Sequence, residues 1–353
     1  MIKSIGFLSM QFEEEEKRDF RPSFFGKLKS IGNPILLDET YGAKLGYSKH
    51  DYLGANPSIR FCSRSEVLRS DIVSSVRTPI NDELLQMKRG ATLFSMLHFV
   101  TRRNRNVMLQ DLGVRMYAMD SVVDDFGLRM IQDFPGTVRS ALLSGFNLLD
   151  VDALHGLCRI LIIGTGELGK LAVDYAVKLA PAPAIVTSVG RSMTDDRIEM
   201  IKLLSKTDMI IDSSKRTETH KHIIDNDMLG SLPEHAVIVD ISADDYDTSV
   251  NPIQVKGIEG IPTGNLHRYL FETDDPAYDM IPAGVRSKNR RRLVSCNAWP
   301  GMDADHCLDR YEKQIEPFIR ILARYESFDN SDDPYIRALN RSSFDEFNRE
   351  LTK

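Results

Sequence analysis

Short apolar runs alternate with helically spaced segments along the first part of the chain. Such runs, bounded by polar and turn residues, predict β-strands: IGFLS (5–9), NPILLD (33–38), SDIVSSV (70–76), ATLFSML (91–97) and VRMYAM (114–119). Helical spacing is found between them in SRSEVLRS (63–70) and NRNVMLQDLG (104–113). The alternation predicts a first α/β unit over residues 1–136.

The pattern becomes more regular after residue 136. TVRSALLSGFNLLD (137–150) has helical spacing and predicts a bridge between two domains. Strand-like and helical runs then take turns: RILIIG (159–164), GELGKLAVDYAVKLA (166–180), AIVTSVG (184–190), DDRIEMIKLLSK (195–206), DMIIDSS (208–214) and HAVIVDIS (235–242). Near-continuous apolar strands between helices are typical of a parallel sheet covered on both faces.

We therefore expect an α/β protein with two Rossmann-like domains, each a doubly wound parallel sheet, and an active site in the cleft between them. Residues 137–284 would form the dinucleotide-binding domain. Residues 1–136 would form the catalytic and substrate domain, completed by 285–353, which contain LVSCNAWPG (293–301) and a long helix over 305–327. The tail from Phe328 is expected to be a peripheral helix or a frayed end.

Composition narrows the functional classes. A chain of 353 residues with 42% hydrophobic and 27% charged residues is long enough for two cores. Its net charge of -6 argues against nucleic-acid binding, and the basic run SKNRRR (287–292) is interpreted as a solvated face or loop. No apolar stretch approaches the roughly 20 residues of a membrane span, and MIKSIGFLSM (1–10) is interpreted as a buried strand, not a signal peptide.

The cysteines are scattered without CxxC spacing, which favours neither a disulfide framework nor a metal site and is typical of a cytoplasmic protein. They are Cys62, Cys158, Cys296 and Cys307. We expect no metal, no nucleic-acid partner and no membrane association.

GTGELG (164–169) matches the G-x-G-x-x-G pattern between a predicted strand and a predicted helix. In such a turn Gly164 would permit the sharp bend, Gly166 would let backbone amides approach a pyrophosphate, and Gly169 would allow close packing of the helix. Cofactor contacts are expected along the whole turn, from Gly164 through Thr165, Gly166, Glu167, Leu168 and Gly169. The alternative is a tight strand-to-helix turn that binds nothing.

The end of the next strand favours one cofactor. An NAD site carries an acidic residue there to accept hydrogen bonds from the ribose. In TSVGRSMT (187–194) no carboxylate occurs, while Ser188, Arg191 and Ser192 are suited to donate to a 2′-phosphate. NADP(H) is therefore favoured over NAD(H). The alternative is that Arg191 is a solvated loop residue and either cofactor is accepted.

Several motifs in order along the chain resemble the alanine dehydrogenase and pyridine nucleotide transhydrogenase family, which also contains saccharopine dehydrogenases and carboxyethylornithine synthase. They are PILLDETYGAKLGYSKHDYLGA (34–55), VRTP (76–79), MKRGATLFSMLHFV (87–100), GVRMYAMDSVVDDFG (113–127), the glycine turn, VDISADD (239–245) and CNAWP (296–300). Within the family, the basic and hydroxyl-rich end of the second strand and the D-x-x-A-D core at 240–244 are most similar to carboxyethylornithine synthase.

The resemblance implies two catalytic residues. His98 falls on the family's catalytic histidine, and an imidazole titrating near neutrality is suited to give and take a proton at a carbinolamine or imine. Asp244 falls on an acidic residue near the nicotinamide, where a carboxylate would stabilise a positively charged iminium. The alternatives are a structural histidine at a strand end and a turn or helix-cap aspartate.

Three further residues are expected to bind substrate. Arg77 stands where the family typically has lysine. Arginine cannot exchange protons usefully but grips a carboxylate with two parallel bonds, so we expect it to anchor the oxo acid and leave proton transfer to His98. Arg18 is a weaker match to a substrate arginine of the family, since EEEEKRDFR (13–21) is also consistent with a charged loop. Asn297, by resemblance, lines the nicotinamide and substrate pocket.

The implied activity is opine-type reductive condensation of an amino acid with a 2-oxo acid such as pyruvate, with a small-molecule amino acid and a 2-oxo acid as the substrates. One alternative is an alanine dehydrogenase-like enzyme that uses ammonia. A second, from another class, is a non-catalytic NADP(H)-binding sensor or assembly protein. The family resemblance also implies a homo-oligomer.

Overall fold

The chain divides into two compact units in a computed structural model that describes residues 2–328 and 331–351. Unit 1 comprises Met1–Asp133 and Ala304–Lys353, and unit 2 comprises Phe134–Asp303. The first boundary lies three residues before the expected one. The second differs more: residues 285–303, expected to complete the first domain, belong to unit 2, because Arg292–Ser295 pairs along its whole length with a strand of that unit.

Unit 1 is built on a six-stranded sheet, β3-β2-β1-β4-β5-β6, in which every pairing is parallel. The strands are β1 (Ile5–Phe7), β2 (Ile35–Asp38), β3 (Ile59–Cys62), β4 (Ile72–Arg77), β5 (Thr92–Met96) and β6 (Arg115–Ala118). The chain runs from β1 outward to β3 and then returns to β4. The strand order therefore reverses between β1 and β4, and ligands of doubly wound sheets bind beyond the carboxyl ends of the strands at such a reversal.

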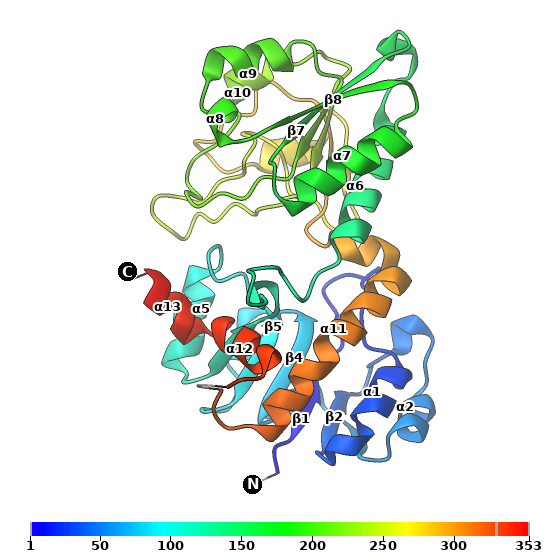
Figure 1. The fold of residues 1–353 in the computed structure, drawn as a ribbon, viewed down its shortest axis with the longest axis vertical. Coiled ribbons are helices and arrows are strands. Elements are labelled where there is room, and N and C mark those ends of the chain that lie inside the picture. The colour runs from blue at the N-terminus through cyan, green and yellow to red at the C-terminus, as the bar shows by residue number, and fades with distance from the viewer. Residues whose placement is uncertain (1, 329–330, 352–353) are drawn as a thin grey trace. The chain divides into compact units, whose positions relative to one another are not determined.

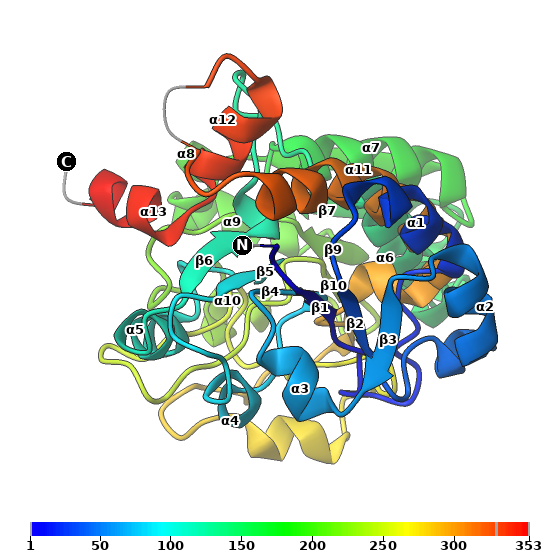
Figure 2. The same cartoon turned by 90° about the horizontal axis from the view of Figure 1, so that it is seen from below.

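Helices cover both faces of this sheet. They are α1 (Pro22–Leu28), α2 (Lys49–Ala55), α3 (Arg64–Leu68), α4 (Asn81–Leu84), α5 (Arg103–Asp111), α11 (Ala304–Arg324), α12 (Pro334–Arg341) and α13 (Phe344–Leu351). Figure 2 shows α1 and α11 on one face and α3 and α5 on the other. The long helix α11 buries Leu308, Ile315 and Phe318 in the same apolar cluster as Phe7 of β1 and Phe24 of α1. The C-terminal part of the chain thus completes the core that the N-terminal part begins.

Unit 2 holds the second sheet, β11-β12-β10-β9-β7-β8, in which β11 alone runs antiparallel to its neighbour. Its strands are β7 (Cys158–Ile163), β8 (Ala184–Val189), β9 (Met209–Asp212), β10 (Val237–Asp240), β11 (Leu270–Phe271) and β12 (Arg292–Ser295). Its helices are α6 (Phe134–Leu148), α7 (Glu167–Leu179), α8 (Arg191–Thr194), α9 (Arg197–Leu204) and α10 (Asn226–Leu229).

The helices of unit 2 enclose its sheet as the sequence pattern predicts. In Figure 1, α6 and α7 lie on one side of the strands and α9 and α10 on the other. Two apolar clusters correspond to these faces, one containing Leu142 of α6 and Ala172 of α7, the other Met200 of α9 and Leu229 of α10. The strand order reverses between β7 and β9, which places the expected dinucleotide turn at the reversal. The α/β prediction with two doubly wound sheets is confirmed.

Two arginines of the basic run SKNRRR donate hydrogen bonds within unit 2, whereas the charge of the run predicts a solvated face or loop. Arg291 is buried and donates to the backbone carbonyls of Leu232 and Pro233, while Arg292 donates to the carbonyl of His235. These guanidinium groups thus donate to backbone carbonyls of the segment that precedes β10. Over residues 2–328 and 331–351, no helix is long and apolar enough to pass through a bilayer.

Candidate active site

The glycine turn between β7 and α7 has the backbone that a dinucleotide fingerprint requires. Gly164 has φ of 113°, in the left-handed region, and a Cβ there would lie 2.8 Å from the carbonyl oxygen of Ser213. A Cβ on Gly169 would lie 1.9 Å from the carbonyl oxygen of Gly164, so only glycine lets α7 pack this closely. A Cβ on Gly166 would meet nothing within 4 Å. Two glycines are thus required by packing, and the third faces open space where the 13-residue helix α7 begins.

This geometry fits a pyrophosphate. The amide groups of the first turn of α7 have no partner within the helix, and the helix dipole favours an anion at that end. Glu167 and Leu168 are the first two residues of α7, and Thr165 lies against Gly190 at the end of β8. Nicotinamide dinucleotides supply a hydride acceptor or donor when bound in such a cradle.

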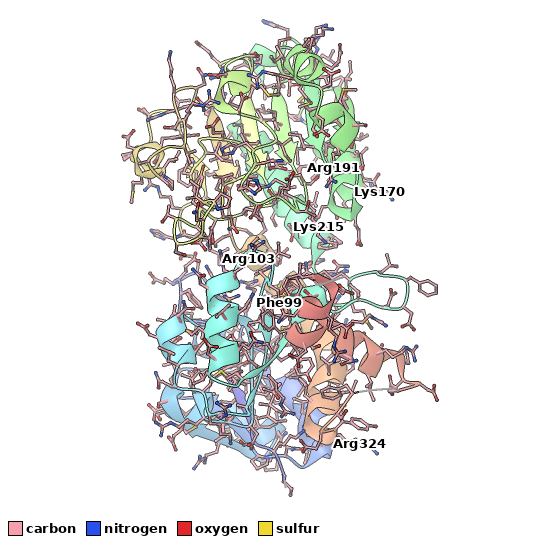
Figure 3. All side chains as sticks on the ribbon, turned by 90° about the vertical axis from the view of Figure 1, so that its left-hand side faces the viewer. Phe99, Arg103, Lys170, Arg191, Lys215 and Arg324 are labelled. Carbon is pink, nitrogen blue, oxygen red and sulfur yellow. The ribbon has the colours of Figure 1, made fainter. Side chains whose placement is uncertain are left out.

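Basic side chains gather around the ends of β7, β8 and β9. Arg191 begins α8 directly after β8, and it is exposed, as are Lys170 on α7 and Lys215 after β9 (Figure 3). Ser188 donates a 3.4 Å hydrogen bond to the carbonyl oxygen of Gly164, and Ser192 is exposed beside Arg191. The residues expected at a 2′-phosphate therefore lie next to the turn, with two lysines that the sequence interpretation did not include.

Two buried aspartates end the neighbouring strands β9 and β10. Asp240 accepts hydrogen bonds from the Nζ of buried Lys256 and the Oγ of Ser295, both at 2.9 Å. Burial acts to raise the pKa of Asp240, but Lys256 outweighs it and the pKa is lowered. Asp212, in contrast, has its pKa raised to about 6 by burial and by the charge of Asp240. One carboxylate of this pair is compensated by a cation, and the pKa of the other is raised toward neutrality.

The raised pKa of Asp212 predicts a pH-dependent cost of folding. Below pH 4 the group is protonated in both the folded and unfolded chains. Between pH 4 and 6 only the folded chain keeps the proton, so its stability falls as the pH rises through this window. The total cost above pH 6 is about 3 kcal/mol. We expect Asp212→Asn to remove it, so that the difference in unfolding free energy between the variant and the native protein grows from pH 4 to 6 and is constant above.

Urea denaturation at a series of pH values measures this difference. Asp240→Asn is the contrasting variant, because it leaves Lys256 buried without its carboxylate and should destabilise the protein near neutrality. A difference between Asp212→Asn and the native protein that does not change with pH would contradict the assignment.

Asp244 follows β10 and is held by an arginine from the loop after β9. Its Oδ2 accepts a 2.6 Å hydrogen bond from the Nη2 of Arg216, and its side chain is 25% exposed. Ala243, the residue before it, has φ of 47°, and its amide donates to Asp240. Non-glycine residues in this conformation are strained and cluster at functional sites. The structure therefore fixes Asp244 at the carboxyl edge of the sheet, paired with a cation.

Asn297 lies at the same edge, two residues after β12, with an exposed side chain and an amide that donates to the carbonyl of Gly264. Trp299 nearby is buried in the core and donates its Nε1 hydrogen to the carbonyl of Asp240 at 2.9 Å. The expected residues of unit 2 thus lie at the carboxyl ends of its strands or shortly after them.

In unit 1, His98 lies two residues after β5 with φ of 49°. Its amide donates a 3.0 Å hydrogen bond to Oδ1 of Asp120, and its Nδ1 lies 3.6 Å from Oδ2 of the same residue. Its side chain is 54% exposed. A carboxylate at Nδ1 orients an imidazole and leaves Nε2 for the solvent side, an arrangement suited to proton transfer. Asp120, whose carboxylate contacts His98, is not among the residues predicted from the sequence.

Arg77 ends β4, the strand next to β5, but it is already paired with carboxylates. Its Nη1 lies 2.5 Å from Oε1 of Glu13 and 3.2 Å from Oε2 of Glu16. Glu16 also binds Arg18 through two hydrogen bonds of 2.6 and 2.9 Å, and Arg18 is buried. Burial acts to raise the pKa of Glu16, but Arg18 and Arg77 outweigh it and the pKa is lowered. Both expected substrate arginines are neutralised by the EEEE segment, and a carboxylate at Arg77 would compete with Glu13.

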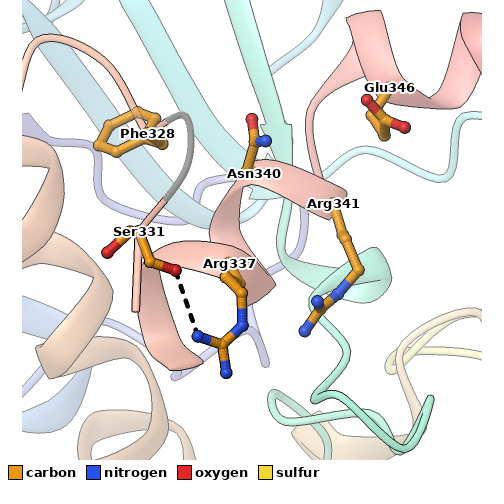
Figure 4. Close-up of a pocket in the computed structure, with 6 residues that line it drawn as sticks. All are labelled: Phe328, Ser331, Arg337, Asn340, Arg341 and Glu346. Carbon is orange, nitrogen blue, oxygen red and sulfur yellow. Dashed lines mark hydrogen bonds between the residues drawn. The ribbon is translucent and has the colours of Figure 1, made fainter. Parts of the chain in front are cut away.

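A pocket of about 270 Å³ lies elsewhere in unit 1, beside α12 and α13 (Figure 4). It is lined by Phe328, Ser331, Arg337, Asn340, Arg341 and Glu346. Its two arginines both pair with Asp125, at 2.5 and 3.0 Å. These contacts anchor the C-terminal helices to the hairpin at 123–129 and account for the charges that line the pocket.

Comparison with known proteins links unit 1 to a family. Residues 11–132 match the model of the family described as "Alanine dehydrogenase/PNT, N-terminal domain". The chain is 24% identical over 194 residues to the NAD(P) transhydrogenase subunit alpha of Haemophilus influenzae, a match that covers 50% of the chain and 36% of that subunit. It is 22% identical over 251 residues to the alanine dehydrogenase of Halomonas elongata, covering 63% of the chain and 68% of that enzyme.

Solved structures extend the likeness to both units. A structure of L-alanine dehydrogenase superimposes with a TM-score of 0.66 at 16% identity and covers 96% of this chain and 94% of that one. At this identity the likeness shows the fold alone. The two-sheet fold of this chain is thus one that a solved structure of L-alanine dehydrogenase shares.

Proposed function

We propose that the chain, whose residues 11–132 match the model of the alanine dehydrogenase/PNT N-terminal domain family, is an NAD(P)H-dependent oxidoreductase. In this proposal it reduces an imino acid, formed from a 2-oxo acid and an amine, to an amino acid. The observation that carries the proposal is the glycine turn, where packing requires Gly164 and Gly169 and open space lies at Gly166. The relatives favour ammonia as the amine, as in an alanine dehydrogenase. Assembly as a homo-oligomer remains a prediction.

In this proposal each candidate residue has a separate role in the reaction. Arg77 would hold the carboxylate of the oxo acid in exchange for Glu13. His98, oriented by Asp120, would donate a proton to the departing hydroxyl of the carbinolamine and take one back in the reverse direction. Asp244 would stabilise the positive charge of the iminium, and Asn297 would contact the substrate or the nicotinamide.

The test is oxidation of NADPH and of NADH by the purified protein with pyruvate, with ammonium in one arm and a pool of diamino acids containing ornithine and lysine in the other. We expect turnover in the ammonium arm and none in the diamino-acid arm, a result that supports an amino-acid dehydrogenase. Turnover only with the diamino acids would replace it with the opine-type reaction of carboxyethylornithine synthase. A third outcome is that the protein binds the cofactor but shows no turnover in either arm or with other 2-oxo acids. This outcome would favour a non-catalytic sensor. The pairing of Arg77 with glutamates supports that alternative.

A single substitution tests the preference for NADP(H) that we propose from the end of β8. Arg191→Ala should weaken NADPH binding more than NADH binding by about 1.5 to 3 kcal/mol, the value of a hydrogen bond to a charged group. Fluorescence titration of both cofactors measures the difference. Arg159→Ala is the control, because Arg159 lies at the opposite end of β7 and should change neither affinity. Equal losses for both cofactors would remove Arg191 from a 2′-phosphate site.

A further inference from the structure

The two sheets of the chain differ at one edge. In unit 1 the chain adds β3 outside β2, and all four residues of β2 are buried. In unit 2 the corresponding strand is β8, because it follows β7 through α7 as β2 follows β1 through α1. After β8 the chain forms α8 and α9 and returns to β9, so the sheet order ends at β8. Within residues 2–328 and 331–351, no strand lies on the outer edge of β8.

β8 lacks the features that protect an exposed sheet edge. It is the six-residue strand AIVTSV (184–189), which contains neither a charged residue nor proline. Only its last residue, Val189, is buried, and Ile185 is 53% exposed. The other edge strands carry a charge or are very short: Arg60 lies in β3, Arg115 lies in β6, and β11 has two residues. Long uncharged edges pair readily with other chains, so β8 is the edge at which a strand can be added.

The backbone of β8 directs hydrogen-bonding groups away from the sheet. The carbonyl of Val189 accepts from the amide of Gly164, and the carbonyl of Pro183 accepts from the amide of Cys158. Because the direction of these groups alternates along a strand, the odd-numbered residues of β8 face β7 and the even-numbered residues face outward. The outward residues are Ala184, Val186 and Ser188. Their amides and carbonyls form a row that a further strand would satisfy.

The helices on both faces of the sheet carry exposed apolar side chains in the same part of unit 2. Val177 of α7 is 65% exposed, and Ile198 of α9 is 68% exposed. These two helices lie on opposite sides of the strands (Figure 1). Asp174 and Lys178, also exposed, lie one helical turn apart beside Val177. Among the described residues, neither of these two side chains has an ion pair or a hydrogen bond.

This arrangement is complementary to a second copy of itself. A two-fold axis perpendicular to the sheet would pair two β8 strands antiparallel and place the two α7 helices antiparallel on the same face. Asp174 of one copy would then face Lys178 of the other, and the exposed apolar residues would meet their counterparts. A six-residue strand is only about 20 Å long. The flanking helices must therefore contribute to the roughly 800 Å² that each partner buries in a stable dimer.

We propose that the outer edge of β8 binds the β8 strand of a second copy of this chain, which joins the two six-stranded sheets of unit 2 into one continuous sheet. The inference does not depend on the proposed reaction, and its tests require no turnover. β8 leads into Gly190, which lies against Thr165 of the glycine turn. The added strand would therefore also support one side of the candidate cofactor site.

Sedimentation equilibrium of the intact protein over a range of concentrations tests the association. We expect the native protein to contain an even number of copies and Ile185→Lys to contain half as many. The dissociation constant should rise by about 100-fold or more, because the two-fold axis brings like charges together in the interface. Leu270→Lys is the matched control, since Leu270 is 42% exposed in β11, the opposite edge strand of the same sheet, and should leave the mass unchanged. Circular dichroism checks the folding of both variants.

Hydrogen exchange of the native protein tests the same contact without a substitution. The outward amide of Val186 has no strand to pair with in a single copy and gains one in the pair, whereas the amide of Thr187 is bonded to β7 in both states. We expect exchange at Val186 to slow by about 10-fold or more as the protein associates, and exchange at Thr187 to change little. This measurement decides the matter if Ile185→Lys does not fold.

Three results would overturn the proposal. The first is a native protein that stays monomeric at every concentration. The second is an oligomer whose mass is the same in folded Ile185→Lys as in the native protein, which would place the interface on another surface. The third is protection of Val186 that does not depend on concentration, because another segment of the same chain would then cover the edge. None of these results bears on whether the protein reduces an imino acid, so the proposed function is tested separately.

Discussion

Replacing His98 by asparagine is expected to lower kcat with pyruvate and ammonium by about 10² to 10⁴-fold, the contribution of a positioned general acid. Asparagine is chosen because it tolerates the left-handed backbone conformation at this position, φ 49°, better than most residues do. The fold and the affinity for the cofactor should therefore be unchanged. Steady-state kinetics combined with fluorescence titration of NADPH measures both quantities.

His155→Asn is a closely matched control. His155 has the same φ of 49°, but it precedes β7, at the end of the sheet opposite to the glycine turn. The same substitution in the same backbone conformation should leave kcat unchanged. If His98→Asn retains more than about a third of the native rate, the proton is transferred by another group and His98 serves only to hold Asp120.

Glu16 is expected to give the largest change in stability. Glu16→Ala leaves the buried guanidinium of Arg18 without its bidentate partner and removes one carboxylate from Arg77. Breaking one side of a buried ion pair typically costs about 3 to 5 kcal/mol, because the remaining charge has lost its water and its counter-ion. Thermal and urea denaturation measure this loss.

Glu14→Gln provides the control for the same segment. Glu14 is exposed, and an exposed substitution of this kind should change the unfolding free energy by no more than about 0.5 kcal/mol. A loss for Glu16→Ala as small as that for Glu14→Gln would mean that Arg18 reaches solvent or another carboxylate in solution. The ion-paired triad of Arg18, Glu16 and Arg77 would then be disproved.

The sequence pattern predicts the layers of the fold well because periodicity reports burial directly. It misses β3, where Arg60 interrupts a short run at the sheet edge, and β11, a two-residue antiparallel edge strand. Both are edge elements in which one neighbour is enough for pairing and apolar patterning is weak. The second domain boundary is misplaced for a related reason, since nothing local in residues 292–295 tells which of two sheets they join.

The candidate site, like the fold, is predicted only in part from the sequence. The sharp bend at Gly164 and the close packing at Gly169 are predicted from the sequence, because the φ of Gly164 and the approach of Gly169 to Gly164 are properties of the local backbone. The partners of charged side chains are not predicted, because they come from segments far apart in the sequence: Glu16 pairs with Arg77, 61 residues away, and Arg216 with Asp244.

The insertion of unit 2 between Asp133 and Ala304 bears on how the protein is made. During synthesis the strands of unit 1 emerge first, yet the apolar residues of α11 that complete their core are translated after the whole of unit 2. At ordinary elongation rates this delay lasts roughly 10 to 30 s. For that time Phe7, Phe24 and their neighbours remain incompletely covered, while unit 2, continuous in sequence, is free to fold as it leaves the ribosome. The nascent chain therefore has a period of exposure to chaperones and to aggregation that a consecutive arrangement of the same two units would avoid.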